Sequence, residues 1–390
     1  MKNYIYLDKG YHENLSEKLF NEIKKNSGII INLDEEGGVD FANKNALKAR
    51  YTKSLFEHVD FTFFWGSVQY ELAKDKIITD SKTMITGHPR FELLKPQYRY
   101  LFNDSANKIN RKFGDFILIN TNMSFGNNIR GDDFVISNYG HRFKEIKQII
   151  AFDKKKLKAY RSMILDISLK TKKTIVIRPH PEEDRSFYHE LINNNNNIHL
   201  INEGSVISWI LASNIMIHPD CTTAIESLFI GRKPISFLPR NFDEALVANL
   251  PLKGSLIFNN KDKLIDFINS DSINNENNDV FKYKFLEESF SFSKDTINII
   301  VEQISRIAKN VNNKNLYSLK LSNRIHFLLK TIQSVIMPDD KLIKSKLADF
   351  SKKRVEKYHK NIISNELHFK NILYKKITNK LFYFFKGKQF

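Results

Sequence analysis

The stretch that most constrains the fold is 214–234, NIMIHPDCTTAIESLFIGRKP. Its first four residues are mostly apolar and predict a short buried strand. The chain then turns at His218-Pro219-Asp220-Cys221 and enters a helix at Thr222 or Thr223, which Gly231 ends. A strand, a tight polar turn and a helix in this order predict a parallel α/β sheet.

The start of this helix has two possible roles. In an open parallel sheet, the backbone N–H groups at such a helix start can bind a phosphate, and Thr222 and Thr223 add hydroxyl donors. Glu226 lies one turn further on, within reach of a ribose. The alternative is a capping box, because Thr223-x-x-Glu226 also fits a helix that satisfies its own first turn.

The same alternation of strands and helices extends over most of the chain and predicts an α/β protein with two Rossmann-like domains. We expect an N-terminal domain at 1–110, a nucleotide-binding domain at 111–285, and C-terminal helices with a basic amphipathic tail at 286–390. The Asn-rich segment 103–112 is the predicted boundary between the first two. Strands are expected at 29–33, 60–65, 77–86, 115–122, 174–177, 198–201, 214–217 and 235–238, and helices at 12–25, 142–170, 204–212, 285–310 and 314–336.

Three polar motifs each follow a predicted strand. They are Glu35-Glu36-Gly37, His180-Pro181 and Thr222-Thr223. A helix is expected to begin at Pro181, with the acidic residues 182–184 in its first turn. Each motif alone is more typical of a loop or a helix start, but ligands of open α/β sheets bind at the carboxyl ends of the strands. Together the three motifs predict a ligand site.

The net charge of +17 is concentrated near the C-terminus. Residues 311–390 carry 18 Lys and Arg against 5 Asp and Glu, a net charge of +13, so the body is not expected to bind nucleic acid. The chain has one cysteine, no apolar run of about 18 residues and no signal-peptide pattern at its start, which predicts a cytoplasmic protein. The tail interleaves Lys and Arg with apolar and aromatic residues. It is expected either to attach to the anionic inner face of the cytoplasmic membrane or to dock on the protein or on a partner subunit.

The order acidic–acidic–Gly, His-Pro and paired Thr resembles that of bacterial sialyltransferases and polysialyltransferases of the GT-B type. The wider sequence is similar to bacterial surface carbohydrate biosynthesis proteins, which are related to the GT-B transferases of Kdo. Over roughly residues 1–250, the segments that carry this resemblance are LDEEGG at 33–38, TGHPRFELL at 86–94, ILINTN at 117–122, RPHPEED at 178–184 and HPDCTTAIES at 218–227.

The resemblance implies a GT-B-like enzyme of surface polysaccharide biosynthesis. It would transfer a 2-keto-3-deoxy sugar acid, Kdo or a nonulosonate, from a CMP donor to a saccharide or lipid-linked saccharide acceptor. The donor is a substrate, and no further cofactor is implied. The resemblance also implies a shortened first domain, because such proteins carry a further α/β segment before the part that matches YIYLDKG.

On this model His180, with the adjoining Pro181, and the Thr222-Thr223 helix start would bind the CMP phosphate, and Glu226 the ribose. The Glu35-Glu36 turn would supply the acid–base carboxylate. Three more residues are candidates from their chemistry alone. Asp220 is an extra carboxylate near the phosphate turn, His218 is either a second phosphate contact or a buried histidine, and Arg178 either orients the sugar carboxylate or pairs with Glu182 or Glu183.

Metal ligation is not expected, because no Asp-x-Asp element is present and protein donors can meet the charge of the leaving phosphate. Two other functions stay open. One is another GT-B enzyme, such as a UDP-sugar transferase, a UDP-sugar 2-epimerase or a polyol-phosphate transferase. The other is a non-catalytic scaffold of a polysaccharide assembly complex.

Overall fold

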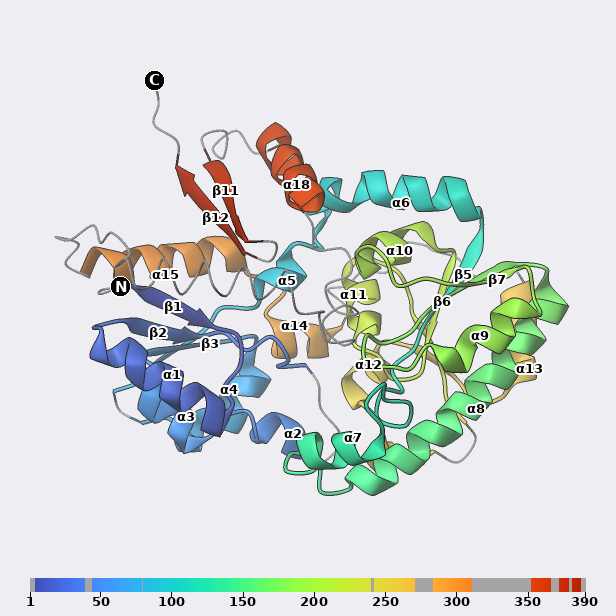
Figure 1. Cartoon of the computed structure of the whole chain (residues 1–390), viewed down its shortest axis with the longest axis horizontal. Helices are drawn as coiled ribbons and strands as arrows, with labels where there is room; N and C mark the ends of the chain where they lie inside the picture. The colour runs from blue at the N-terminus through green and yellow to red at the C-terminus, as the bar shows by residue number, and fades with distance from the viewer. Residues whose placement is uncertain are drawn as a thin grey trace.

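The computed structural model describes residues 4–38, 44–78, 80–239, 242–270, 283–310, 352–365, 372–378 and 381–386 of the 390-residue chain. Two parallel sheets organise these residues (Figure 1). No helix in the described ranges is both long and apolar enough to span a bilayer.

The first sheet has four parallel strands in sequence order. They are β1 (Ile5–Asp8), β2 (Ile29–Asn32), β3 (Phe61–Phe64) and β4 (Lys82–Ile85), connected through α1 (Glu13–Lys25), α2 (Asn45–Lys48), α3 (Lys53–His58) and α4 (Ser67–Ala73). Side chains alternate between the faces of a strand, so Ile30 and Phe64 pack against α1 and α3, whereas Ile31 and Phe63 point to the opposite face.

That opposite face is covered by a helix from the other end of the chain. Ile300 and Ile307 of α15 (Thr296–Asn310) belong to the same core cluster as Ile31 and Phe63. Before α15, α14 (Lys284–Phe290) packs beside α4. A Cβ on Gly66 would lie 2.2 Å from the Glu288 carbonyl oxygen, so the approach of α14 to the first domain requires glycine there. The predicted helices at 285–310 therefore complete the first domain.

The second sheet has six parallel strands in the order β10-β9-β8-β5-β6-β7. These are β5 (Phe116–Asn120), β6 (Thr174–Arg178), β7 (Ile198–Leu200), β8 (Ile215–His218), β9 (Ile235–Phe237) and β10 (Leu256–Phe258). This is the strand order of a Rossmann fold, whose direction of winding reverses between β5 and β8. The two Rossmann-like domains predicted from the sequence are confirmed, although β10 was not predicted.

Helices cover both faces of the second sheet. Ile117 and Ile119 of β5 pack with α8 (Ile146–Thr171) and α13 (Lys261–Asn269), whereas Phe116 and Leu118 face the opposite side. On that side lie α6 (Tyr100–Phe113), α10 (Val206–Ala212) and α11 (Thr223–Phe229). The remaining helices are α5 (Pro89–Glu92), α7 (Asp132–Tyr139), α9 (Ser186–Asn193) and α12 (Asn249–Lys253), with short 3-10 turns at Lys74–Lys76, Pro96–Tyr98 and Glu244–Leu246.

The segment 103–112, the predicted boundary between the first two domains, forms part of α6, which packs on α10. One local prediction was wrong. The helix expected from Pro181 begins only at Ser186, because residues 181–185 form a turn. Glu183 is 1% exposed within that turn and accepts hydrogen bonds from Thr121 Oγ1 at 2.8 Å and Tyr188 OH at 2.6 Å. These tertiary contacts stabilise the turn against the predicted helix.

The tail is partly helical. Helix α18 (Lys352–Asn365) lies on α6, where Lys357 Nζ donates to Ser105 Oγ at 2.6 Å and Tyr358 packs against the core. Beyond it, β11 (Ile372–Thr378) and β12 (Leu381–Lys386) pair as an antiparallel hairpin, where the sequence analysis expected a helical tail. β-Branched and aromatic residues of this segment favour strands. The predicted helix at 314–336 lies outside the described residues.

Candidate active site

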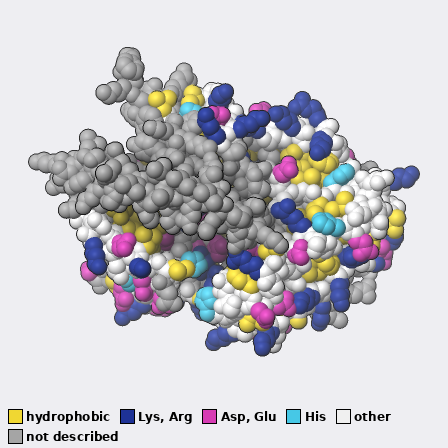
Figure 2. All heavy atoms as spheres, in the orientation of Figure 1, with side chains coloured by type: hydrophobic (Ala, Val, Ile, Leu, Met, Phe, Trp, Pro, Cys, Tyr) yellow, Lys and Arg dark blue, Asp and Glu magenta, His cyan; other side chains and the backbone are white. Residues whose placement is uncertain are grey.

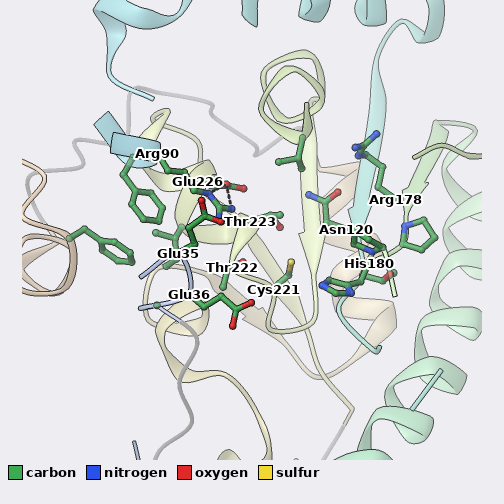
Figure 3. Close-up of a pocket in the computed structure, with 18 of the residues that line it drawn as sticks. Glu35, Glu36, Arg90, Asn120, Arg178, His180, Cys221, Thr222, Thr223 and Glu226 are labelled. Atoms are coloured by element: carbon green, nitrogen blue, oxygen red, sulfur yellow. Dashed lines mark hydrogen bonds and ion pairs between the residues drawn. The ribbon is translucent and has the colours of Figure 1, made fainter. Parts of the chain in front are cut away.

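A pocket of about 400 Å³ lies between the two domains at the carboxyl ends of both sheets (Figure 3). On the second domain it opens at the ends of β5 and β8, where the sheet changes its direction of winding and where Rossmann-like sheets bind ligands. This cleft completes the GT-B-like arrangement predicted from the sequence. The pocket is lined by Glu35, Glu36, Gly38, Trp65, Arg90, Phe91, Asn120, Thr121, Arg178, Pro179, His180, Pro181, Asn202, Val206, Cys221, Thr222, Thr223, Ile225, Glu226 and Phe290.

The second domain contributes buried polar atoms without partners. Asn120, 3% exposed at the end of β5, has no hydrogen-bond partner for either side-chain atom among the described residues. The same holds for Glu226 Oε2, and Glu226 is also 3% exposed. Thr223 Oγ1 has no nitrogen or oxygen partner in the described part of the chain and lies beside the Cys221 thiol. Unpaired buried polar groups are costly, so a cluster of them on a pocket wall indicates a polar ligand.

Glu226 does not cap its own helix. The N-cap of α11 is Thr222, which makes no side-chain capping hydrogen bond, so the capping-box alternative was wrong. Instead Glu226 Oε1 accepts two hydrogen bonds from Arg90, from Nε at 2.9 Å and from Nη2 (Figure 3). Arg90 belongs to α5 of the first domain, so this ion pair joins the two domains at the pocket.

The first domain contributes the turn 35–36 after β2. It is held from behind by Asp34, which accepts from Arg50 Nε and Nη2 at 2.6 Å each and from the Glu36 backbone N–H at 2.7 Å. The two candidate carboxylates differ in their partners. Glu36 is bound by Arg50 at 2.9 Å, with Arg142 at 3.8 Å, whereas Glu35 pairs with the mostly exposed Lys9 at 3.0 Å and lies within electrostatic reach of Arg90. Glu35 is thus the less constrained of the two.

His180 and Arg178 both line the pocket at the end of β6. His180 Nδ1 accepts from the Glu182 backbone N–H at 3.3 Å, and this contact fixes the ring orientation. Arg178 donates to the carbonyl oxygens of Glu203 at 2.6 Å and Gly204 at 3.1 Å, and stacks on Trp209.

His218 and Asp220 lie outside the pocket. His218 is fully buried, with Nε2 2.9 Å from Ser255 Oγ, and burial lowers its pKa to about 3. Asp220 Oδ1 accepts from Lys156 Nζ and Oδ2 accepts from the Ala248 backbone N–H, each at 3.1 Å. Both polar ends are directed into the interior, so the structure assigns these residues to holding the turn that precedes Thr222 rather than to the pocket.

Cys221 also lines the pocket, and burial, as the leading cause, raises the pKa of its thiol to about 11. The thiol is therefore neutral at physiological pH and is not an activated nucleophile. Beside it, the pocket has an apolar wall of Trp65, Phe91 and Phe290, whose rings contact one another.

Sequence reasoning missed several polar residues that line this pocket, among them Arg90 and Asn120. Both lie within segments that carried the family resemblance, TGHPRFELL and ILINTN. The signal for Asn120 was available, because it ends an otherwise apolar strand that is buried along its whole length. No local signal identified Arg90, since its partner Glu226 is 136 residues away.

Within the described residues there is no group of three or more His, Cys, Asp or Glu side chains arranged to hold a metal ion. No family model and no curated protein matches the chain.

Among solved structures, the chain is similar to the wall teichoic acid polymerase TagF, with 13% identity and a TM-score of 0.46 over 79% of this chain and 73% of that one. It is also similar to UDP-GlcNAc 2-epimerases. The enzyme of Methanocaldococcus jannaschii has 13% identity and a TM-score of 0.48 over 78% of this chain and 76% of that one. The enzyme of Neisseria meningitidis has 16% identity and a TM-score of 0.48 over 77% and 76%.

Proposed function

We propose that this protein is a glycosyltransferase that uses a nucleotide-activated sugar. The observation that carries the proposal is the set of buried, unpartnered polar atoms of Asn120 and Glu226 at the point where the Rossmann-like sheet changes its direction of winding. Nucleotides bind at this point of such sheets. A carboxylate oxygen without a donor is suited to accept a hydrogen bond from a ribose hydroxyl.

The phosphate of the nucleotide would lie at the start of α11. Thr222 and Thr223 line the pocket there, and His180 faces the same space from β6 (Figure 3). Hydroxyl and imidazole donors stabilise the negative charge that develops on a departing phosphate. In this role His180 would donate from Nε2, because Nδ1 already accepts a hydrogen bond from the Glu182 N–H.

The acceptor hydroxyl would be activated by Glu35 from the opposite domain. Glu35 lines the pocket and its side chain is half-exposed, whereas Glu36 is held by two arginines. A general base must be able to reach and accept a proton, and a carboxylate paired with an exposed lysine is better suited to that task than one held by two arginines. In an inverting reaction Glu35 takes the proton of the acceptor hydroxyl as the oxygen attacks the anomeric carbon, and the nucleotide leaves with the bonding electron pair.

The donor we propose is a CMP-activated 2-keto-3-deoxy sugar acid, either Kdo or a nonulosonate. The support is the similarity of LDEEGG, RPHPEED and HPDCTTAIES to bacterial sialyl- and Kdo-transferases of surface polysaccharide synthesis. The acceptor would be a saccharide or a lipid-linked saccharide.

We further propose that the protein works in the cytoplasm at the inner face of the membrane. Lys352, Lys353 and Lys360 are exposed on α18, which packs on α6, and α6 carries the exposed Lys108, Arg111 and Lys112. Figure 2 shows Lys and Arg side chains gathered along this upper edge. Anionic lipids attract such clusters.

Ligand-induced thermal stabilisation tests the nucleotide proposal. CMP should stabilise the protein more than UMP or UDP does. The stabilisation by CMP should reach about 2.7 kcal/mol at a concentration about 100 times its dissociation constant. The double variant Thr222→Ala/Thr223→Ala should lose most of this shift. Thr171→Ala/Thr174→Ala, where α8 ends and β6 begins, lies at the amino ends of the strands and should keep it. Equal stabilisation by UDP would favour a UDP-sugar enzyme, and no response to any nucleotide would favour a scaffold.

A further inference from the structure

The ion pair between Arg90 and Glu226 uses only part of each side chain. Both hydrogen bonds from Arg90 end on Glu226 Oε1. They come from Nε and Nη2, which form one edge of the guanidinium group. The second edge, formed by Nη1 and the outer hydrogen of Nη2, makes no hydrogen bond that the structure shows among the described residues, and the Arg90 side chain is 45% exposed.

The pair therefore presents two complementary groups to the same pocket. Among the described residues, Glu226 Oε2 is an acceptor without a donor, and the outer edge of Arg90 is a fork of donors for which no acceptor is seen. Two parallel N–H groups of arginine match the two oxygens of a carboxylate or a phosphate. Because the two residues come from different domains, a ligand that bound both would contact both walls of the cleft.

Other cations near the pocket are engaged by the protein itself. The Arg178 guanidinium donates from Nη1 and Nη2 to two backbone carbonyls and stacks on Trp209. Arg50 donates from Nε, Nη1 and Nη2 to Asp34 and Glu36. Arg90 thus has the better placed donor edge for an anionic group of the ligand, including the sugar carboxylate that the sequence analysis associated with Arg178.

We propose that Arg90 is a specificity residue that binds an anionic group of the donor beyond its first phosphate, while Glu226 accepts from the nucleotide's ribose. This inference rests on the proposed function and adds to it a ligand with a second anion beyond the phosphate at Thr222. Two chemical sources fit, the carboxylate of a sugar acid and the second phosphate of a nucleoside diphosphate. Both would be held by charge-assisted hydrogen bonds from the outer edge of the guanidinium.

The test compares wild type with Arg90→Lys by isothermal titration calorimetry against CMP, CDP and CMP-N-acetylneuraminic acid. A lysine retains the charge opposite Glu226 but cannot donate a second, parallel pair of N–H groups. We expect the melting temperature and the affinity for CMP to stay near wild type. The affinity for the ligand with the second anion should fall about tenfold, the equivalent of 1.4 kcal/mol.

The ligand that loses affinity identifies the source of the anion. Selective loss for CMP-N-acetylneuraminic acid indicates the sugar carboxylate, and selective loss for CDP indicates the second phosphate. Equal losses for all three ligands, or no loss for any, would overturn the role of Arg90. Failure of wild type to bind any of the three would instead refute the proposed function.

Two further variants keep this test interpretable. Arg90→Gln/Glu226→Gln removes both charges together, so no unpaired carboxylate stays buried if the lysine variant folds poorly. It should show the same selective loss, together with weaker binding of CMP through the altered Glu226. The control is Arg161→Lys, which changes an arginine paired with Glu190 on the surface of α8, and should bind all ligands as wild type does.

Discussion

The two domains meet at one pocket but contribute opposite kinds of groups to it. The first domain presents Glu35 and Glu36 on a turn, with side chains 50% and 57% exposed and ion-paired to basic residues. The second presents Asn120 and Glu226, each 3% exposed, with polar atoms that no described residue satisfies. The wall from the first domain is exposed to solvent and its charges are paired, and we call it the wet wall. The wall from the second domain is buried and has polar atoms without partners among the described residues, and we call it the dry wall.

This difference suggests a division of labour. A dry wall with unsatisfied polar atoms gains most from a ligand that fits it closely, because the ligand pairs groups that water does not reach. A solvent-exposed carboxylate of the wet wall can exchange one partner for another with little loss of free energy. The second domain is therefore suited to hold the nucleotide and the first to act on the acceptor.

The largest effect should come from the wet wall. Glu35→Gln removes the proposed base without changing the shape of the turn, and should lower turnover by roughly 10²–10⁴-fold. Binding of CMP should be unchanged, since Glu35 lies on the opposite domain. Steady-state rates and calorimetry on the same preparation measure both quantities. Glu36→Gln is the matched comparison, and near-normal rates for both variants would show that the acidic turn is only a loop.

The second effect tests what holds the dry wall in place. Lys156 of α8 lies between Asp153 at 2.8 Å and Asp220 at 3.1 Å. Burial disfavours its charge, but the two carboxylates outweigh burial and raise its pKa. Asp153 in turn binds the Phe125 backbone N–H, so Lys156 connects the loops that follow β5 and β8.

Lys156→Met would leave two buried carboxylates without a cation and should lower the free energy of unfolding by about 3–5 kcal/mol. Lys154→Met, at another position of α8, breaks an exposed pair with Asp132 of α7 and should cost only about 0–1 kcal/mol. Denaturant titration of both variants provides the comparison. Similar losses would mean that the buried cluster does not stabilise the second domain more than a surface pair does.

These features also mark the limit of sequence reasoning. Glu35, His180 and Thr222 were found because each directly follows an apolar strand, which is a local pattern. His218 and Asp220 follow a strand too, yet they face the interior, because their partners Ser255 and Lys156 come from distant elements. Arg90 depends on Glu226 and the turn at 181–185 depends on Thr121 and Tyr188, and no local pattern encodes such pairs.

A smaller effect, on the pH dependence of stability, should appear in both domains. Each domain buries one histidine. Burial lowers the pKa of His218 to about 3, and burial together with nearby Arg90 and Lys9 lowers that of His88 to about 4. An unfolded histidine titrates near 6.5, so the unfolded chain binds more protons below that pH.

Stability should therefore be fully present above pH 6.5 and fall as the pH drops, by about 1.4 kcal/mol per pH unit for each histidine, down to the folded pKa. The slope is the change in the free energy of unfolding per pH unit, as measured by denaturant titration between pH 6 and pH 5. His218→Asn and His88→Asn should each lower it by the contribution of one proton, about 1.4 kcal/mol per pH unit. The exposed His141 is the control position. A slope that neither variant changes would contradict these assignments.

The smallest effect concerns membrane binding by the basic surface of α18 and α6, away from the pocket that distinguishes the two domains. Lys353→Gln on α18 should weaken partition to anionic liposomes by about fivefold, which corresponds to about 1 kcal/mol for one near-surface charge. Truncation after residue 338 should abolish it, while binding of CMP persists. Lys170→Gln on α8 is the control. If wild-type protein does not bind such liposomes at low salt, the proposed membrane attachment is wrong. The role of α18 would then be to pack on α6.

The way α15 closes the first sheet has a consequence for biosynthesis. Ile31 and Phe63 emerge from the ribosome early, but Ile300 and Ile307 of α15, which belong to the same core cluster, are made more than two hundred positions later. Synthesis at about 5–20 residues per second leaves that apolar face uncovered for roughly ten seconds or more. The nascent first domain is therefore expected to be a chaperone client until α15 emerges and docks.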